Sequence, residues 1–377
     1  MTTKSFITFN LSDLETQLLS YLTSGFKPTL GIVFCSPQLP FEAIGRLFDQ
    51  YDIDLLGCTT AGEIVNEELH EASIACLLLD VKRTFYKPIF IKNTEGVFPT
   101  CQQLRQQADN YFENPALIVT SAGVLNDGEE VVRGLKSGNL REIPIFGGLA
   151  GDDLNIVNTY IFSRKHMTND GIAAIVFDYN HIDIQGIATS GWEALGSFHT
   201  VTKAAGNLIY TINDEPALDY FIRFFGYYDD ANVKDKPIST ISAQYPLQVM
   251  RGTDYAVLRS PIKGDEETRS LMLVGSIKEG DKFRFSISPG ISVIDTTIDE
   301  FKQFKQAIPD ADALILFSCK GRHAALGPFI EDEIKGIYEQ WHKPMIGFLS
   351  YGEIGNMRNG TCEFHNETCS LVIIKEK

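Results

Sequence analysis

One order of segments occurs three times along the chain, and this repetition constrains the fold more than any other feature. Each copy has an apolar strand, a helical stretch, an apolar stretch that enters a Gly-rich turn with an acid, and a final apolar strand. The copies begin near residues 30, 116 and 313, and the second is the loosest of the three. Sequence repeats of this kind usually build one supersecondary unit per copy.

The repeat predicts an α/β fold. Its strand runs, such as LGIVFCS (30–36) and SIACLLLD (73–80), are apolar at successive positions, as in strands that are covered on both faces. The helical stretches space their apolar residues three to four apart, so that one face of each helix can cover a sheet. Because strand–helix–strand order favours parallel pairing through a right-handed crossover, we expect α/β units, two in the N-terminal half and one in the C-terminal half.

The stretch from 181 to about 300 departs from this pattern. It consists of β-rich segments separated by turn signals, with one helical candidate at EPALDYFIRFFGYY (215–228). We therefore expect an antiparallel insert or hinge here, so that the fold is α+β in part. The polar stretch DDANVKDKP (229–237) is a candidate exposed loop and domain boundary.

The Gly-rich turns are the first candidate site. Each contains Gly followed by an acid, and the acids are Glu63, Asp152 and Glu353. Such turns follow strand ends, where open α/β sheets commonly bind ligands, and glycine lets a ligand approach the backbone closely. The alternative, of about equal weight, is that they are tight turns whose acids cap local structure. Neither GxxxxGK[ST] nor GxGxxG is present, so none of the three is a phosphate loop.

The run Cys319-Lys320-Gly321-Arg322-His323 is the second candidate site, at the end of a predicted strand. Arg322 can clamp a carboxylate through its bidentate guanidinium. An enzyme is the alternative, with Cys319 as nucleophile, His323 as base and Glu353 as the orienting group. A structural thiol at Cys319 is the more common case, because a nucleophile needs a lowered pKa and a base within reach.

A third candidate is Cys362-x-x-His365-Asn366-x-x-Cys369, which superficially suggests zinc. A structural zinc site needs four ligands, and Cys369 begins an apolar strand, so we expect Asn366 to cap a turn instead. His70 and His365 occupy similar places in their repeats, between the Gly-acid turn and the last strand. No CxxCH is present, which excludes covalent c-type haem but leaves b-type haem with one axial histidine open.

Composition and charge exclude several classes of protein. The 377 residues carry a formal net charge of −16 and no Lys/Arg cluster of the kind that binds nucleic acid or anionic membranes. The N-terminus resembles no signal peptide, and no apolar run nears the length that spans a bilayer, so we expect a cytoplasmic protein without membrane insertion. The seven cysteines are odd in number and several lie in apolar runs, as expected of reduced, buried thiols.

Five motifs resemble the signatures of the FIST family of sensory proteins: GCTTAGEI, FGGLAGDD, LFSCKGR, GFLSYGEIG and FHNETCSLVII. They occur in the family's order over residues 25–375. The resemblance implies an N-terminal segment (1–25), a FIST N-like domain with two repeats (26–220), and a FIST C-like domain with the β-rich segment and the third repeat (221–377).

The resemblance also implies a function: sensing a small-molecule ligand and regulating a partner, either a histidine kinase or a cyclic-di-GMP signalling protein, without catalysis. A free-standing chain of this length is similar to bacterial haem proteins that sense nitric oxide, with haem b as cofactor and His70 or His365 as axial ligand. The alternative is a sensor of an amino acid or another small carboxylate, held by Arg322, the Gly-acid turns and Asn366. Self-association into a homo-oligomer is left open.

Overall fold

Each copy of the repeat forms the centre of its own six-stranded sheet in the computed structural model of the chain, which describes residues 1–137, 141–226, 245–252, 255–288, 290–357 and 361–377. The first sheet has the order β1 (Thr2–Thr8), β6 (Ile74–Asp80), β2 (Leu30–Cys35), β3 (Asp54–Thr59), β10 (Ile161–Phe162) and β11 (Met167–Thr168). The second has the order β7 (Tyr86–Lys92), β12 (Gly171–Asp178), β8 (Pro115–Ser121), β9 (Ile145–Leu149), β24 (Glu353–Asn356) and β25 (Cys362–His365). The third has the order β13 (Ile182–Thr189), β26 (Cys369–Glu376), β22 (Ala313–Cys319), β23 (Met345–Ser350), β4 (Glu63–Val65) and β5 (Glu68–His70).

The three sheets share one pattern of strand directions. The first two long strands of each repeat pair in parallel, as β2 with β3, β8 with β9 and β22 with β23. The last strand of each repeat then joins the far side of the first one in antiparallel fashion, as β6 does beside β2. The sequence therefore predicted the parallel pairs correctly, while the complete sheets are mixed.

The repeats exchange their hairpins in a closed ring. The hairpin β4–β5 belongs to the first repeat but pairs with β23 of the third. The hairpin β10–β11 of the second repeat pairs with β3 of the first, and β24–β25 of the third repeat pairs with β9 of the second. Each sheet is therefore completed by a hairpin from another repeat.

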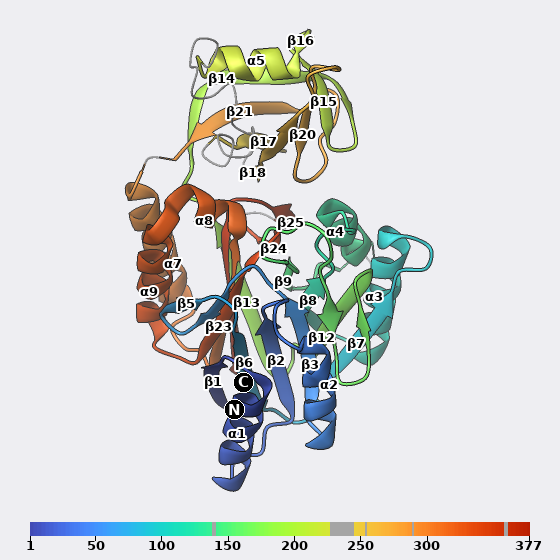
Figure 1. Cartoon of the computed structure of the whole chain (residues 1–377), viewed down its shortest axis with the longest axis vertical. Coiled ribbons are helices and arrows are strands. Elements are labelled where there is room, and N and C mark those ends of the chain that lie inside the picture. The colour runs from blue at the N-terminus through green and yellow to red at the C-terminus, as the bar shows by residue number, and fades with distance from the viewer. Residues whose placement is uncertain (138–140, 227–244, 253–254, 289, 358–360) are drawn as a thin grey trace.

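The inner faces of the three sheets enclose one hydrophobic core, to which every repeat contributes residues such as Ile32, Ile118 and Ile315. Burying a side chain of this size contributes about 1.5–3 kcal/mol, which accounts for the apolar runs in the sequence. Helices cover the outer faces: α1 and α2 cover the first sheet, α3 and α4 the second, and α7 and α9 the third, as Figure 1 shows. Their bounds are α1 (Leu11–Thr23), α2 (Phe41–Gln50), α3 (Val97–Tyr111), α4 (Gly128–Lys136), α7 (Ser292–Ala307), α8 (Lys320–Leu326), η1 (Gly327–Phe329) and α9 (Ile330–Trp341).

An antiparallel module follows β13 and lies at one end of the three sheets, at the top of Figure 1. The long strand β14 links its two halves, and α5 packs on its own aromatic core. The module confirms the antiparallel insert and the helix that the sequence predicts. Its elements are β14 (Glu193–Ala205), β15 (Leu208–Ile212), β16 (Glu215–Pro216), α5 (Ala217–Phe224), β17 (Leu247–Arg251), β18 (Tyr255–Arg259), β19 (Pro261–Gly264), β20 (Leu271–Leu273) and β21 (Lys282–Ile287).

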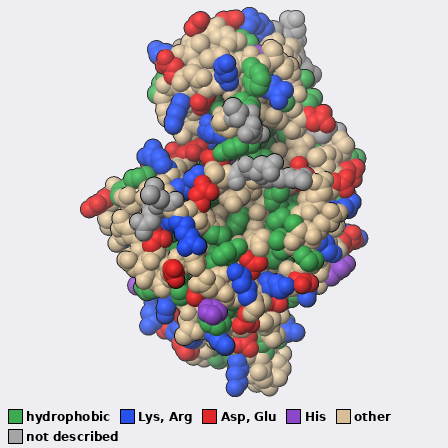
Figure 2. Space-filling model, turned by 180° about the vertical axis from the view of Figure 1, so that it is seen from behind, with side chains coloured by type: hydrophobic (Ala, Val, Ile, Leu, Met, Phe, Trp, Pro, Cys, Tyr) green, Lys and Arg blue, Asp and Glu red, His purple; other side chains and the backbone are tan. Residues whose placement is uncertain are grey.

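The fold is thus α/β with an added antiparallel part, as expected. The candidate loop at 229–237 lies outside the described residues, so the boundary at 220/221 stays a prediction. Among the helices of the described residues, none is long and apolar enough to span a bilayer. Figure 2 shows charges of both signs interspersed on one face, with hydrophobic side chains gathered in its middle.

Candidate functional site

The Gly-acid turns lie at the ends of β3, β9 and β23, as the sequence predicts. Gly62 and Gly352 have φ angles of +135° and +157°, which a residue with a side chain rarely adopts. A Cβ atom on Gly151 would lie 2.9 Å or less from the backbone at Thr60 and Ala61, so this glycine allows a close approach of two chain segments. Each of the three positions therefore requires glycine, either for its backbone conformation or for close packing.

The two glutamates of these turns point into the protein and not toward a ligand. Glu63 accepts hydrogen bonds from the hydroxyl of Thr60 and from both the amide (3.1 Å) and the hydroxyl (2.7 Å) of Ser73. Glu353 has corresponding contacts, from Ser350 Oγ at 2.5 Å and Thr368 Oγ1 at 2.8 Å. Each glutamate thus fastens the start of an exchanged hairpin to the last strand of its repeat.

Burial dominates the titration of these glutamates. It raises the pKa of Glu63 to about 7 and that of Glu353 to about 8, although the hydroxyl donors act in the opposite direction. Both side chains are fully buried. Their contacts match the expectation that these acids cap tight turns, which was the alternative to ligand binding.

Asp152 holds an exposed loop in place. Its carboxylate accepts hydrogen bonds from the amides of Ile156 (2.9 Å), Val157 (2.7 Å) and Asn158 (3.1 Å). The hydroxyl of Tyr351, in the third repeat, donates to the same carboxylate at 2.5 Å. Asp152 therefore joins the second and third repeats and is fully engaged within the chain.

Arg322 forms a buried ion pair. Its Nε donates to Glu333 Oε2 at 2.8 Å and its Nη2 to Glu333 Oε1 at 2.5 Å, and both side chains are 0% exposed. The same guanidinium donates to the carbonyls of Ser190 and Glu367 and packs over the ring of Trp192. Its donors are used inside the protein, so Arg322 holds α8, α9 and the start of the antiparallel module together and has no free face for a ligand.

Cys319 lies at the buried end of β22. Burial raises the pKa of its thiol well above the ordinary range, and nearby Glu353 and Glu367 raise it further. Burial and the adjacent Lys320 lower the pKa of His323, whose Nδ1 lies 3.2 Å from Lys320 Nζ. This environment disfavours the thiolate that the enzyme alternative requires.

The cysteines of the chain are all buried free thiols. In the described parts of the chain, no three or more His, Cys, Asp or Glu side chains are arranged to hold a metal ion. Asn366, from the zinc-like run, donates to the carbonyl of His365 at 3.1 Å, and its Oδ1 is buried without a partner in the structure as described. It lies in the turn between β25 and β26, where the sequence predicts it.

A pocket of about 410 Å³ lies at the seam between the first and second sheets, where β3 runs beside β7 and β12. At the corresponding seam between the second and third sheets, a backbone bridge joins Ala188 to Met357, whereas the described residues show no such bridge at the first seam. This seam pocket is lined by Asp54, Leu55, Leu56, Pro88, Ile89, Phe90, Ser163, Arg164, Lys165, His166, Ala173 and Ala174.

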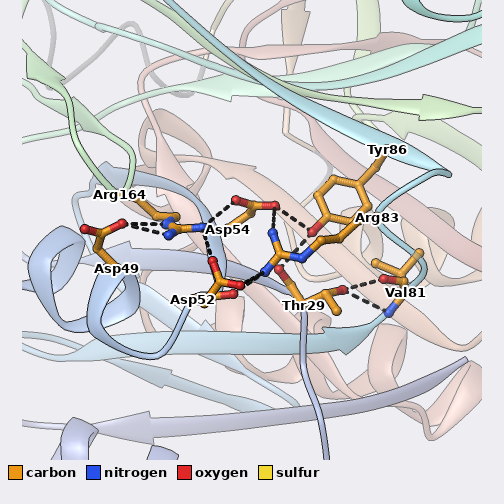
Figure 3. A network of polar contacts seen from close by, with 8 residues as sticks. All are labelled: Thr29, Asp49, Asp52, Asp54, Val81, Arg83, Tyr86 and Arg164. Carbon is orange, nitrogen blue, oxygen red and sulfur yellow. Dashed lines mark hydrogen bonds and ion pairs between the residues drawn. The ribbon is translucent and has the colours of Figure 1, made fainter.

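An ion-pair network (Figure 3) includes Arg164 and Asp54, two residues that line the seam pocket. Arg164, in the turn of the exchanged hairpin β10–β11, donates to Asp49 at 2.7 Å and to Asp52 and Asp54 at 3.0 Å each. We call these four residues the Arg164 clasp. Asp54 also accepts a hydrogen bond of 2.7 Å from Arg83, so one carboxylate connects β3, the hairpin and the loop before β7.

The histidines proposed for haem do not lie at this pocket. His70 hydrogen-bonds to Glu68 at 3.0 Å and contacts the ring of Phe9. His365 is fully buried, and its Nε2 donates to the carbonyl of Gly355 at 3.0 Å.

Two domain families match the chain, the FIST N domain over residues 29–215 and the FIST C domain over residues 217–356. The chain belongs to the FIST family. FIST domains are of the sensory and signalling class. No curated protein matches the chain.

In this FIST protein the sequence motifs and the pocket lie in different places. The seam pocket is lined only by residues of the FIST N domain, between 54 and 174. Arg322 and Cys319 lie in the FIST C domain, in α8 and at the end of β22. Sequence reasoning missed the pocket because its lining comes from four separate short stretches; the run Ser-Arg-Lys-His at 163–166, in a turn between two strands, was the one local signal.

Proposed function

We propose that this FIST protein binds a small ligand in the seam pocket and reports its occupancy to a partner signalling protein. The observation that carries the proposal is the pocket of about 410 Å³ between two sheets, with apolar walls and a polar rim. Ligand pockets commonly enclose about 300–1,000 Å³, are lined mainly by apolar side chains with a few polar groups, and form where structural units meet.

The Arg164 clasp supports the sensory part of the proposal, because it gives the pocket a wall that can move. The hairpin β10–β11 pairs with β3 through Ile161 and Phe162, next to a backbone bond from Thr59 to Tyr160, and its turn is held by the ion pairs of Arg164. Partly exposed ion pairs of this kind contribute about 0–1 kcal/mol each. A ligand shifts the hairpin only by the difference between its affinities for the two hairpin positions, and a 10- to 100-fold difference, about 1.4–2.7 kcal/mol, is comparable to the contribution of the clasp.

The partner in this proposal is a histidine kinase or a cyclic-di-GMP signalling protein that reads the position of the hairpin. The chain acts by binding and not by catalysis. Burial of Cys319 supports this, because a thiol with a raised pKa is a poor nucleophile near neutral pH.

Haem b reporting nitric oxide is one version of the proposal, with His70 or His365 as the axial ligand or, if haem binds in the seam pocket, His166. His166 lines the seam pocket and packs near Phe90, with ring centroids 5.5 Å apart, whereas His70 and His365 lie elsewhere. When bound, haem would supply the iron that takes up nitric oxide, while Phe90 and Ala173 would contact its apolar surface. The small-carboxylate version would use Lys165 at the rim in place of the buried Arg322.

The test is binding to a protein whose pocket is blocked. Ser163 is only partly buried at the rim, so Ser163→Trp is expected to fill the pocket while the fold is kept. Ser12→Trp, on the exposed surface of α1, is the matched control. The protein is titrated with haem b and with glutamate, followed by the Soret band and by calorimetry, and a partner kinase is assayed with and without ligand. Binding that Ser163→Trp abolishes and Ser12→Trp keeps supports the pocket; binding that both variants retain refutes it.

A further inference from the structure

The seam pocket has apolar walls on two sides and an uncompensated cation at its rim. We infer that its ligand is an amphipathic anion, with an apolar body against the walls and a carboxylate or phosphate head group at Lys165. The inference rests on the proposed ligand-binding role of this pocket and specifies the chemistry of the ligand.

Lys165 supplies the charge that selects an anion. The lining residues include two cations, Arg164 and Lys165, and the three aspartates of the Arg164 clasp are all paired to Arg164, two of them also to Arg83. Arg164 is held by three aspartates, whereas Lys165 is exposed and has no carboxylate within 4.0 Å among the described residues. Lys165 is therefore the cation that remains free for a head group.

The apolar walls select a hydrocarbon body. Leu56 of β3 lies on one side, and Pro88 and Phe90, which share one face of β7, lie on the other. On β12, Ala173 pairs with Phe90 and faces the same side as Leu56, where its small side chain occupies little space. Each methylene group of the ligand that contacts such walls should raise the affinity about fourfold.

An extended peptide is a less suitable occupant, although two strand edges face the pocket. Pro88 lies in the middle of the edge strand β7 and has no amide hydrogen to donate to an added strand. Lys87 and Lys92 are exposed on the same strand, and charged residues of this kind protect sheet edges from further pairing. The site is thus better suited to a molecule that binds through apolar contacts than to a peptide that binds through backbone hydrogen bonds.

The experiment is a calorimetric series on the full chain with hexanoate, octanoate, decanoate and decyl phosphate, below their critical micelle concentrations. Decanol supplies the same body without charge. We expect affinity to rise about fourfold per methylene, and decanol to bind at least fivefold more weakly than decanoate. Lys165→Met should weaken decanoate about five- to tenfold and leave decanol unchanged, while Lys335→Met, on the exposed face of α9, should change neither.

Different failures separate this inference from the proposed function. If decanol binds as tightly as decanoate, or if Lys165→Met and Lys335→Met behave alike, the anionic head group is wrong. If the fatty acids fail to bind while haem b, glutamate or an extended peptide binds in a manner that Ser163→Trp abolishes, the ligand class is overturned and the pocket stands. If Ser163→Trp leaves the binding of every probe unchanged, both the inference and the proposed function fall.

Discussion

The guanidinium of Arg164 donates a hydrogen bond of 3.0 Å to Oδ1 of Asp54, and so joins a hairpin of the second repeat to a strand of the first. Asp54 lies on β3 and also lines the seam pocket. The contact therefore couples the position of the hairpin to the shape of the pocket rim, and substitutions at this pair should affect both.

Arg164→Gln should loosen the hairpin without unfolding the protein. The expected loss in the free energy of unfolding is about 1–2 kcal/mol, because three partly exposed ion pairs are removed together. Hydrogen exchange should accelerate at residues 163–166. Arg133→Gln removes an exposed ion pair with Glu130 on α4 and serves as the control. Equal exchange at 163–166 in both variants would show that the clasp does not hold the hairpin.

Arg322→Met should destabilise the protein by about 3–5 kcal/mol, because it leaves the carboxylate of Glu333 buried without its partner. The double variant Arg322→Met/Glu333→Leu should recover much of that loss, since no unpaired charge remains. Urea unfolding of the two single variants and the double variant measures the coupling. Additive losses would argue against the ion pair as the main contact of either residue.

Glu353 should make the protein less stable as the pH rises. Burial raises its pKa from the ordinary 4.5 to about 8, so the folded state binds the proton more tightly than the unfolded state. The free energy of unfolding should then fall between about pH 4.5 and pH 8. Glu353→Gln should flatten this slope, while Glu113→Gln, at an exposed position, should leave it unchanged. Glu63 and Glu367, whose pKa values burial raises to about 7, contribute a slope of the same sign below about pH 7, so an unchanged slope between pH 7 and pH 8 in Glu353→Gln would contradict the assignment.

His365 should have the opposite effect at acid pH. Burial, assisted by Arg259, lowers its pKa from 6.5 to about 4, so the unfolded state takes up the proton first. Stability should decrease as the pH falls from 6.5 to 4, by ~3 kcal/mol in total. His365→Gln retains a donor for the carbonyl of Gly355 and should remove most of this loss. The exposed His181 provides a control, His181→Gln, whose acid unfolding should match that of the unchanged protein.

The sequence was sufficient to predict the helices and strands of each repeat, but not which strands pair between repeats. Leu30–Cys35 was expected to be a strand covered on both faces, and every residue in it is buried. The hairpin exchange could not be predicted, because the residues of β4 do not indicate whether this strand pairs within its own repeat or with β23. Pairing of this kind depends on the tertiary arrangement of the three sheets.

The candidate sites show the same limit. Gly62 and Glu63 were correctly placed in a turn, but only the structure shows Ser73, ten residues later, bonded to that glutamate. Arg322 was interpreted as a carboxylate clamp from its guanidinium and its place at a strand end, and the sequence pattern gives no sign of its contact with Glu333 on a later helix. Residues such as Ala173 and Phe90 are ordinary in isolation, and they form a pocket only when the two sheets meet.

The ring of exchanged hairpins means that the FIST N and FIST C families mark units of sequence and not units of folding. A fragment that ends at residue 215 would present β4–β5 with no sheet to join, and its second sheet would lack β24–β25. The remaining fragment would lack the strands that complete its own sheet. The two halves therefore need one another to fold, in the manner of subunits in an obligate dimer, although one chain carries both.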